Sequence, residues 1–491
     1  MKWTKNLTKV GSPAWLIVGA GLLLSCLGWT LLSTQFRYGQ GHTQRPIIEF
    51  LILYLTAWTV FLFGFVLLKK AKGNGPLVLI IAVSLAARLI LLPSSLIQEN
   101  DVYRYVLDGQ VLRHGVNPYH YSPLVVSDLA QEPLRTELER PEAKEVLSRV
   151  GYPEIPTVYP PAAQVVFAFG AWLGEWNWMG QRWTLLAVDL AVLVSLLHLL
   201  YLLEIPMSWV LLYAWNPLVL KEVINSVHLD VCVALFVLLA LIGLLRYERS
   251  GGFQWPVFSG IAVGVAILFK FYPLLLVAAC FFFLQRRSGR ILSAGTFLAV
   301  VAGTIAVGFL PFLSATFDQL SAGLSTYATR WTMNEGAFVV LSGLFPHPRL
   351  ASALLIATIA MLVPWSRKSQ KVSCLVGDFQ WVLLFWFLLI PAPFPWYAMA
   401  LVALLPLRPL FSAVSAATVV LSGSVGLYYL GFFYEYHDYP SLWWMTTQGI
   451  EHGIIWISLG VFLVHQLGLK TGAPGFQAGS NLDFLATERR K

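Results

Sequence analysis

The chain has 491 residues, of which 57% are hydrophobic and only 12% are charged, and its mean hydropathy is +0.68. This composition excludes a soluble globular protein and is typical of a protein that crosses the membrane several times. The formal net charge is +8, but the basic residues lie in short breaks between apolar segments, which argues against nucleic-acid binding. The four cysteines show neither pairing nor metal-ligand spacing, so no function is assigned to them.

Apolar segments long enough to cross roughly 30 Å of hydrocarbon as helices follow one another along the chain. They lie near residues 13–32, 47–68, 76–97, 183–203, 291–312, 374–391, 412–431 and 451–468. Shorter apolar segments, which should form short, tilted or half-membrane helices, lie near residues 161–175, 207–222, 230–245, 255–269, 272–285, 350–365 and 396–410. The sequence therefore predicts an all-α polytopic bundle of about 11–14 membrane helices, some of them short or re-entrant.

The basic breaks predict which side of the membrane each loop faces. Residues 1–12 carry three lysines before an apolar segment that is too long for a signal-peptide core and should stay as a signal anchor. With that end inside, residues 69–72 also lie inside, and the third helix delivers residues 98–160 to the outer face. The later basic loops, near residues 246–249, 286–290 and 368–371, lie inside only if the chain between residues 161 and 203 starts on the outer side and ends on the inner side. The polar motifs described next converge on the outer face.

One transmembrane domain is expected over residues 1–470, followed by a flexible cytoplasmic tail over residues 471–491. Residues 98–160 form the largest hydrophilic segment. Its charged stretch from Glu132 to Arg149 predicts an amphipathic helix that lies at the membrane surface.

The dozen residues that follow the third apolar segment hold a dense group of ionisable side chains. If they form a helix, Asp101, Arg104, Tyr105 and Asp108 share one face. Because a charged side chain costs roughly 2.5–3.5 kcal/mol at the bilayer centre, this face should line a wet cavity. Asp101 is then a candidate general base with Glu99 as its partner. The alternative is an interfacial loop in which Asp101, Arg104 and Asp108 only neutralise one another.

A turn follows this helix, because Gly115 and Pro118 interrupt it and fold the loop back toward Asp101. His114 and His120 lie beside the turn and could act as acid or base. Loop histidines are, however, more often simply solvated.

A second polar island interrupts the apolar sequence after residue 214. Its members are Trp215, Asn216, Pro217, Lys221, Glu222, Asn225, His228 and Asp230. The functional interpretation is a second rim of the cavity, in which His228 and Asp230 contact the acceptor or the sugar. The alternative is a capped, solvated hairpin, but one turn does not need so many polar groups.

A third polar motif, Lys270-Phe271-Tyr272-Pro273, interrupts a long apolar stretch. Pro273 must break or kink the helix and free the preceding backbone for a ligand. Lys270 is then the candidate cation for a phosphate group. The alternative is a lysine that extends to the membrane interface.

Two weaker elements complete the set. Arg330, in a predicted outer loop, could clamp a phosphate, and Trp396 and Tyr397 at a helix junction could stack on a sugar ring. Aromatic residues are also common at the headgroup level without any catalytic role.

Taken together, these motifs carry a resemblance. In chain order they are Glu99-x-Asp101, Val102-Tyr103-Arg104-Tyr105, Asp108-Gly109, Asn117-Pro118-Tyr119, Tyr159-Pro160-Pro161, Trp215-Asn216-Pro217, His228-Leu229-Asp230, Lys270-Phe271-Tyr272-Pro273 and Pro395-Trp396-Tyr397. The series resembles the C-type (GT-C) integral-membrane glycosyltransferases, closest to glycosyltransferase family 87 and the polyprenyl-phosphate-mannose-dependent mannosyltransferases. The resemblance spans roughly residues 76–410. The acidic loop here follows the third helix, whereas family members often have it after the first, so residues 1–75 look like an N-terminal addition.

The resemblance implies roles for the motif residues. Glu99 and Asp101 fit the Glu-x-Asp variant of the family's acidic motif and become the catalytic pair, while Lys270, Arg330 and Tyr272 would bind the donor phosphate. Substrate contacts are expected from Arg104, Tyr105, Asp108, Asn117, Tyr119, Tyr159, His228, Asp230, Trp396 and Tyr397. Leu107 stands where many relatives carry tryptophan.

The activity implied is inverting transfer of a hexose, mannose by family analogy, from a polyprenyl-phosphate sugar to a glycan, glycolipid or protein acceptor. The reaction would take place on the extracytoplasmic face, and the absence of retention signals favours a bacterial plasma membrane. Some C-type enzymes use a divalent ion and others do not. Glu99 and Asp101 alone would make only a weak Mg²⁺ or Mn²⁺ site, and no other cofactor is expected.

Two other functions stay open at this point. A multi-spanning transporter or flippase of lipid-linked sugars would also place ionisable residues and proline-broken helices along its path. A glycan polymerase or ligase would use a whole lipid-linked oligosaccharide, but it should carry its charged loop late in the chain. A single outward-facing cavity around Asp101, His228, Lys270 and Tyr397 would favour the transferase, whereas transport requires a path to the other side.

Overall fold

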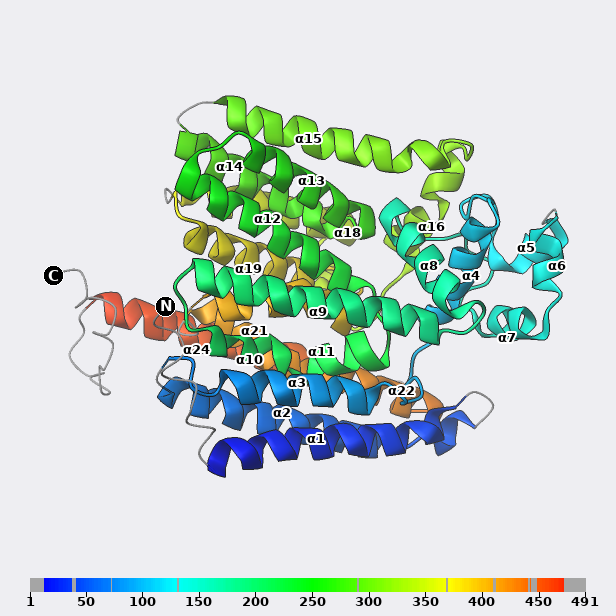
Figure 1. The fold of residues 1–491 in the computed structure, drawn as a ribbon, viewed down its shortest axis with the longest axis horizontal. Coiled ribbons are helices and arrows are strands. Elements are labelled where there is room, and N and C mark those ends of the chain that lie inside the picture. The colour runs from blue at the N-terminus through cyan, green and yellow to red at the C-terminus, as the bar shows by residue number, and fades with distance from the viewer. Residues whose placement is uncertain are drawn as a thin grey trace.

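The computed structural model describes residues 13–37, 41–71, 73–129, 132–288, 291–367, 370–408, 412–439, 442 and 448–471. Among these residues every regular element is a helix, which confirms the predicted all-α class. Figure 1 shows most of the long helices side by side, with a group of short helices at one end. Residues 1–12 and nearly all of the expected tail lie outside the described residues.

Eight helices within the described residues are long and apolar enough to cross a membrane. They are α1 with η2 (Pro13–Phe36), α2 (Ile47–Lys70), α9 (Met179–Leu202), α12 (Asp230–Ser250), α15 with η7 (Ile291–Phe312), α18 (Pro348–Ser366), α19 (Val372–Leu389) and α21 with η10 and α22 (Ala413–Tyr436). Shorter apolar helices complete the bundle: α3 (Leu77–Leu91), α8 (Pro161–Gly174), α13 (Gln254–Phe269), α14 (Val277–Ser288), η8 to η9 (Pro395–Leu407) and α24 (Gly449–Thr471). The chain is therefore a multi-pass membrane protein.

Three segments form helices of a different length from the one predicted. Residues 230–245 and 350–365 were expected to be marginal, but α12 and α18 extend them to full spans. The segment 76–97 was expected to span as one helix, yet α3 ends at Leu91 after 15 residues. Pro93 lacks the N–H that the next helical turn needs, so the chain is irregular up to the start of the next helix.

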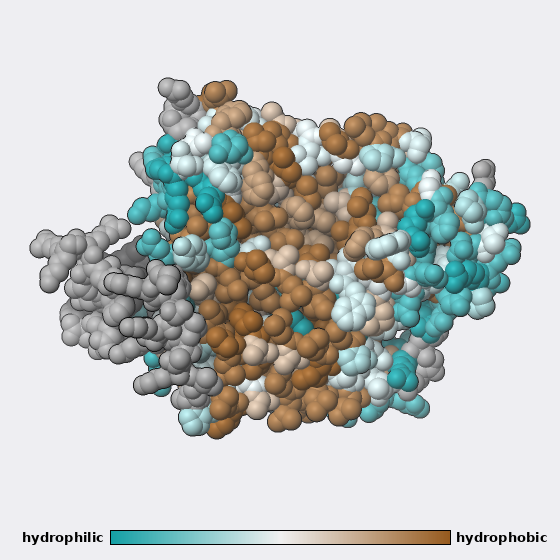
Figure 2. All heavy atoms as spheres, in the orientation of Figure 1, coloured by the Kyte–Doolittle hydropathy of each residue, from teal (hydrophilic) through white to brown (hydrophobic). Residues whose placement is uncertain are grey.

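The bundle has two polar ends separated by an apolar belt (Figure 2). At one end the arginines Arg246, Arg249, Arg286 and Arg287 surround the ends of α9, α12, α14 and α18. Arg287 donates to the Glu248 carbonyl at 2.6 Å, and Arg286 donates to the Trp365 carbonyl at 2.8 Å. We call this the basic end. The opposite end carries residues 98–160 and is called the loop end.

The loop end consists of short helices. They are α4 (Asp101–Arg113), α5 (Pro123–Leu129), α6 (Leu134–Leu138) and α7 (Pro141–Arg149). The single amphipathic helix expected over residues 132–149 is wrong, because Pro141 cannot continue α6 and instead starts α7. α4 packs against α8 so closely that a Cβ on Gly109 would lie 2.2 Å from the Phe167 carbonyl oxygen. Between residues 161 and 203 only α9 is long enough to cross.

Two helices of the bundle are broken where the sequence carries proline. Between α9 and α12 the chain forms η4 (Met207–Val210), α10 (Leu211–Ala214), α11 (Pro217–Val219) and the π-helix η5 (Leu220–Asn225). The break predicted at Pro273 is confirmed: α13 ends at Phe269, Lys270 is extended, and η6 (Tyr272–Leu276) follows. The break at Lys270 and the π-helix η5 lie toward the loop end, where α16 (Phe317–Arg330) also lies, whereas η4 lies beside the connection between α2 and α3, where Ser208 donates to the Gly73 carbonyl at 3.0 Å. The remaining short helices are η3 (His42–Gln44) and α17 (Phe338–Leu344).

Candidate functional site

A cavity of about 1630 Å³ lies at the loop end. Segments far apart in the sequence line it, from the end of η2 through η6 and α16 to α22. The predicted site residues that line it are Glu99, Asp101, Tyr159, Lys270, Tyr272, Arg330, Trp396 and Tyr397. The fold thus brings the acidic motif, the lysine at the helix break and the late aromatic motif to one space.

Glu99 is held on both oxygens. Its Oε1 accepts the backbone N–H groups of Asn100 and Asp101 at 2.8 and 2.7 Å, groups that no preceding turn of α4 could satisfy. Its Oε2 lies 2.9 Å from Nε2 of His228. Burial raises the pKa of Glu99, although the backbone N–H groups and nearby lysines act in the opposite direction. Glu99 therefore anchors the start of α4 through Oε1, while Oε2 lies between His228 and the cavity.

Asp101 is the first residue of α4 and faces the cavity. Its Oδ2 accepts a hydrogen bond from the Tyr159 hydroxyl at 3.3 Å. Burial, reinforced by the negative charge of Glu99, raises the pKa of Asp101 to about 6. A carboxylate with this pKa is still ionised at neutral pH and is a stronger base than an ordinary aspartate.

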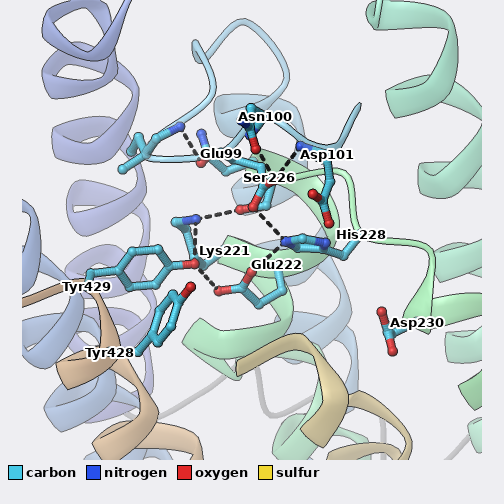
Figure 3. Close-up of polar contacts among 12 residues, drawn as sticks. Glu99, Asn100, Asp101, Lys221, Glu222, Ser226, His228, Asp230, Tyr428 and Tyr429 are labelled. Carbon is cyan, nitrogen blue, oxygen red and sulfur yellow. Dashed lines mark hydrogen bonds and ion pairs between the residues drawn. The ribbon is translucent and has the colours of Figure 1, made fainter. Parts of the chain in front are cut away.

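His228 lies between two carboxylates beneath the cavity (Figure 3). Its Nε2 is 2.9 Å from Glu99 and 3.4 Å from Glu222, off the line of a good hydrogen bond to either. The ring stacks on Trp396 with centroids 3.8 Å apart. Burial lowers the pKa of His228 to about 4. Nearby carboxylates, Glu222 above all, act to raise this pKa, but the effect of burial is larger.

A buried polar network extends from His228 into the protein. The Lys221 ammonium donates to Ser226 Oγ at 2.5 Å and to the Tyr429 hydroxyl at 3.0 Å. Tyr429 in turn donates to Glu222 at 2.7 Å. Lys221 and Glu222 are fully buried, and η5, one turn with π-helical bonding, carries both. Single π-helical turns are frequent at functional sites.

Lys270 lines the cavity next to Asp230, which lies two residues after His228. Its ammonium donates to Asp230 Oδ2 at 2.7 Å and lies 4.5 Å from the centre of the Tyr397 ring. The Tyr397 hydroxyl is hydrogen-bonded to the Tyr327 hydroxyl at 2.7 Å. Because Asp230 uses one of the three ammonium protons, Lys270 keeps two for a ligand in the cavity. Asp230 itself is fully buried and positions the lysine without lining the cavity.

One wall of the cavity is apolar and reaches the lipid-facing surface. Tyr272 stacks on Trp386 with centroids 4.3 Å apart, next to Lys270. The wall continues to Leu274 on η6 and Leu350 on α18, which are 56% and 57% exposed. A long apolar tail could therefore lie along this wall while its polar head reaches the lysine.

Seven predicted substrate contacts do not line the cavity: the buried His228 and Asp230, and five residues between positions 104 and 119. Arg104 donates to three carbonyls of the loop, those of Gly151, Tyr152 and Ile155, and Asp108 is buried against Gln164 at 3.4 Å. The helical face predicted around Asp101 exists, but only its first residue faces the cavity, since residues 150–164 cover the rest.

The other three of the five residues between positions 104 and 119 support the loop. The Tyr119 hydroxyl donates to the Tyr159 carbonyl at 2.7 Å, and the Tyr105 hydroxyl lies 3.5 Å from that of Tyr159. The Asn117 amide donates to the Phe312 carbonyl at 3.1 Å and so ties the loop to the end of α15. Tyr105 and Tyr119 thus position Tyr159, which in turn contacts Asp101.

The two loop histidines also lie away from the cavity lining. His114 contacts the Gln110 carbonyl at 2.8 Å, and His120 lies 3.4 Å from Ser314 beside a second, smaller cavity of about 340 Å³. Neither reaches the acidic motif.

The donor set around the acidic motif does not fit a divalent ion. Oε1 of Glu99 already accepts two backbone N–H groups, which leaves only Oε2 of Glu99 and one oxygen of Asp101, too few ligands to hold a divalent ion. Within the described residues no group of three or more histidine, cysteine, aspartate or glutamate side chains has metal-ligand geometry.

Sequence reasoning missed several residues of this region. Lys221 and Glu222 belong to the second polar island of the sequence, but the sequence predicts no contact for either residue. Tyr429 and Tyr428 gave no signal, because they belong to an apolar span and meet the network only through the fold. Arg45, just before α2, and Arg349, in the first turn of α18, also line the cavity, and neither belongs to a sequence motif.

Comparison with known proteins gives no further guide: no family model, no curated protein and no solved structure matches this chain.

Proposed function

We propose that this membrane protein is an inverting glycosyltransferase of the C type, which moves a hexose from a polyprenyl-phosphate donor to a glycan or lipid acceptor at the extracytoplasmic face. Mannose is the first sugar to test, since the sequence motifs resemble mannosyltransferases. The observation that carries the proposal is one cavity that combines a free carboxylate, a lysine at a helix break and an apolar wall that reaches the lipid.

The donor chemistry explains why these three features belong together. A polyprenyl tail must stay in the hydrocarbon while its phosphate and sugar reach water, so a transferase for this donor needs a cavity at the membrane interface. The wall at Leu274 and Leu350 would hold the tail, and the aromatic residues next to Lys270 would hold the sugar.

Asp101 is the base in the proposed reaction. Its carboxylate takes the proton of an acceptor hydroxyl while the hydroxyl oxygen attacks the anomeric carbon from the face opposite the phosphate. The bond between the anomeric carbon and the phosphate oxygen breaks in the same displacement, so the configuration inverts. A pKa of about 6 suits a base that works near neutral pH.

Lys270 and Arg330 would stabilise the leaving phosphate. A positioned base contributes about 10²- to 10⁴-fold, so cations aimed at the developing charge must supply a further share of the acceleration. Lys270 keeps two ammonium protons for this purpose, and the exposed guanidinium of Arg330 lines the same cavity.

The extracytoplasmic placement rests on charge. The helix ends beside the short connections at the basic end carry Arg246, Arg249, Arg286 and Arg287, and short cytoplasmic loops of membrane proteins carry an excess of arginine and lysine. The loop end, with the cavity, then faces outward.

The cavity lining also favours transfer over transport. A transporter or flippase needs a path between the two ends of the bundle. None of the described residues that line the cavity belongs to the basic end, and the network around Lys221 and Glu222 lies buried beneath the cavity.

The test is transfer of radiolabelled mannose from a synthetic polyprenyl-phosphate mannose to acceptors in membranes that contain the full chain. Asp101→Asn should lower transfer at least about 100-fold, because the amide cannot take the proton. Asp128→Asn is the matched control, since Asp128 is exposed on α5 in the same loop and does not line the cavity.

Equal transfer by wild type and Asp101→Asn would remove Asp101 from the proposed role. Movement of labelled lipid-linked sugar across vesicle membranes without any transfer would instead establish transport.

A further inference from the structure

The charges that line the cavity are mostly positive. The carboxylates in the described lining are Glu99 and Asp101, and the cations are Arg37, Arg45, Arg149, Lys270, Arg330 and Arg349, with His42 beside them. A single donor phosphate needs only part of this set, because one or two cations suffice to pair with one phosphate group.

Arg149 ends α7 and is paired with Glu145, and the other cations fall into two sets on different elements. Lys270, Arg330 and Arg349 belong to the side formed by η6, α16 and α18. Arg37, His42 and Arg45 belong to the connection between α1 and α2, and we call these three residues the N-terminal rim. Figure 1 shows α1 and α2 at one edge of the bundle and α16 and α18 away from that edge, so the two sets belong to different parts of the bundle.

The N-terminal rim is tied directly to the acidic motif. Arg45 donates to Oε1 of Gln98 at 2.9 Å, and Gln98 donates to the Tyr436 hydroxyl at 2.5 Å. His42 stacks on the Tyr436 ring with centroids 4.8 Å apart. Gln98 has a positive φ of 53° and immediately precedes Glu99. These contacts fix the rim at the start of α4, where Asp101 begins.

Among the described residues no carboxylate pairs with Arg37 or Arg45. Nε of Arg45 is buried and has no hydrogen-bond partner. Apolar residues line the cavity next to the rim, namely Phe36, Leu96 and Trp178. Phe36 ends the span of α1, so the rim stands at the depth of lipid headgroups. Arginine's planar fork suits a phosphate at such a place.

We infer that the N-terminal rim binds the anionic headgroup of the acceptor, which is then a phosphate-bearing lipid whose sugar hydroxyl reaches Asp101. This inference rests on the proposed function and adds the class of acceptor to it. The donor phosphate lies on the Lys270 side, the acceptor phosphate lies on the N-terminal rim, and the carboxylate base stands between them. The rim lies outside residues 76–410, so the extra helices α1 and α2 set this specificity.

The experiment measures lipid binding to the purified full chain by titration calorimetry. The probes are dihexanoyl-phosphatidylglycerol, which is anionic, dihexanoyl-phosphatidylcholine, which is zwitterionic, and inorganic phosphate. Wild type should bind the anionic lipid at least about tenfold more tightly than the zwitterionic one. Arg37→Gln/Arg45→Gln should lose this preference and keep its affinity for the zwitterionic lipid.

The matched control is Arg135→Gln/Lys144→Gln, which removes two exposed positive charges from the same end without touching the cavity. It should keep the wild-type preference. Arg37→Gln alone should fold normally, because Arg37 is exposed, and it should lose part of the preference for the anionic lipid. Equal affinities for the two lipids in wild type, or the same loss in the control, would overturn the inference. Inorganic phosphate that binds as tightly as the anionic lipid would overturn the lipid as the source of the phosphate.

A second readout separates this inference from the proposed function. In the transfer assay Arg37→Gln/Arg45→Gln should raise KM for the acceptor and leave KM for the donor unchanged, whereas Lys270→Gln should weaken binding of citronellyl phosphate, a short mimic of the donor lipid. If transfer requires Asp101 but the rim variants bind both lipids as wild type does, the inference alone fails. If lipid preference depends on the rim but no sugar is transferred, the proposed function alone fails.

Discussion

Two carboxylates that stand two residues apart receive different environments. Glu99 is held by two backbone N–H groups and by His228, while Asp101 keeps an oxygen toward the cavity. The motif Glu99-x-Asp101 could be recognised from the sequence. Which of the two stays free could not, because that depends on His228, which lies far along the chain.

The pH dependence of transfer should report Asp101. Protonation disables the base, so transfer falls as pH falls, and the raised pKa moves this loss from near pH 4 to near pH 6. The measurement is kcat/KM for transfer between pH 4.5 and 8, values that bracket an apparent pKa of about 6. Tyr159→Phe should move the acid limb further up, since the Tyr159 hydroxyl stabilises the ionised carboxylate. A limb that stays near pH 4 would contradict this assignment.

At the scale of elements, irregular segments place the polar groups. The break at Lys270, the π-helical turn η5 and the irregular chain before α4 all lie at the loop end. The sequence predicted the first through Pro273. The sequence gave no sign of the π-helical turn η5, because Tyr429, more than 200 residues away, holds the polar side chains of this turn.

The buried pair Lys221 and Glu222 gives the prediction at this scale. Lys221→Met should lower the free energy of unfolding by about 3–5 kcal/mol, because it removes the buried cation that is linked to the buried Glu222 through the Tyr429 hydroxyl. Lys221→Met/Glu222→Gln should recover part of this loss. The measurement is thermal unfolding in detergent micelles for Lys221→Met, Glu222→Gln and the double variant. Strictly additive losses would show that the two residues do not act as a pair.

At the scale of the whole molecule, the two polar ends decide which face holds the cavity. Ser127 on α5 and Ser250 at the end of α12 are both exposed, at the loop end and at the basic end respectively. Each can be replaced by cysteine in a Cys374→Ser background, since Cys26, Cys232 and Cys280 are buried.

With this pair, a membrane-impermeant maleimide should label Ser127→Cys in intact cells and should label Ser250→Cys only after permeabilisation. This result is expected because the positive-inside rule places the basic end in the cytoplasm. The opposite pattern would place the cavity in the cytoplasm and would contradict the proposed use of an extracytoplasmic donor.

The sequence by itself determined the class of the protein, most of its spans and the identity of its polar motifs, because hydrophobic length, proline and buried charge act locally and need no partner to be recognised. Only the tertiary structure decided how these parts are used. It turned Arg104 and Asp108 toward the loop, gave Lys270 the partner Asp230, and brought the connection between α1 and α2 to the cavity. The physical reason is that hydrogen bonds and ion pairs between distant segments depend on helix packing, which no local pattern records.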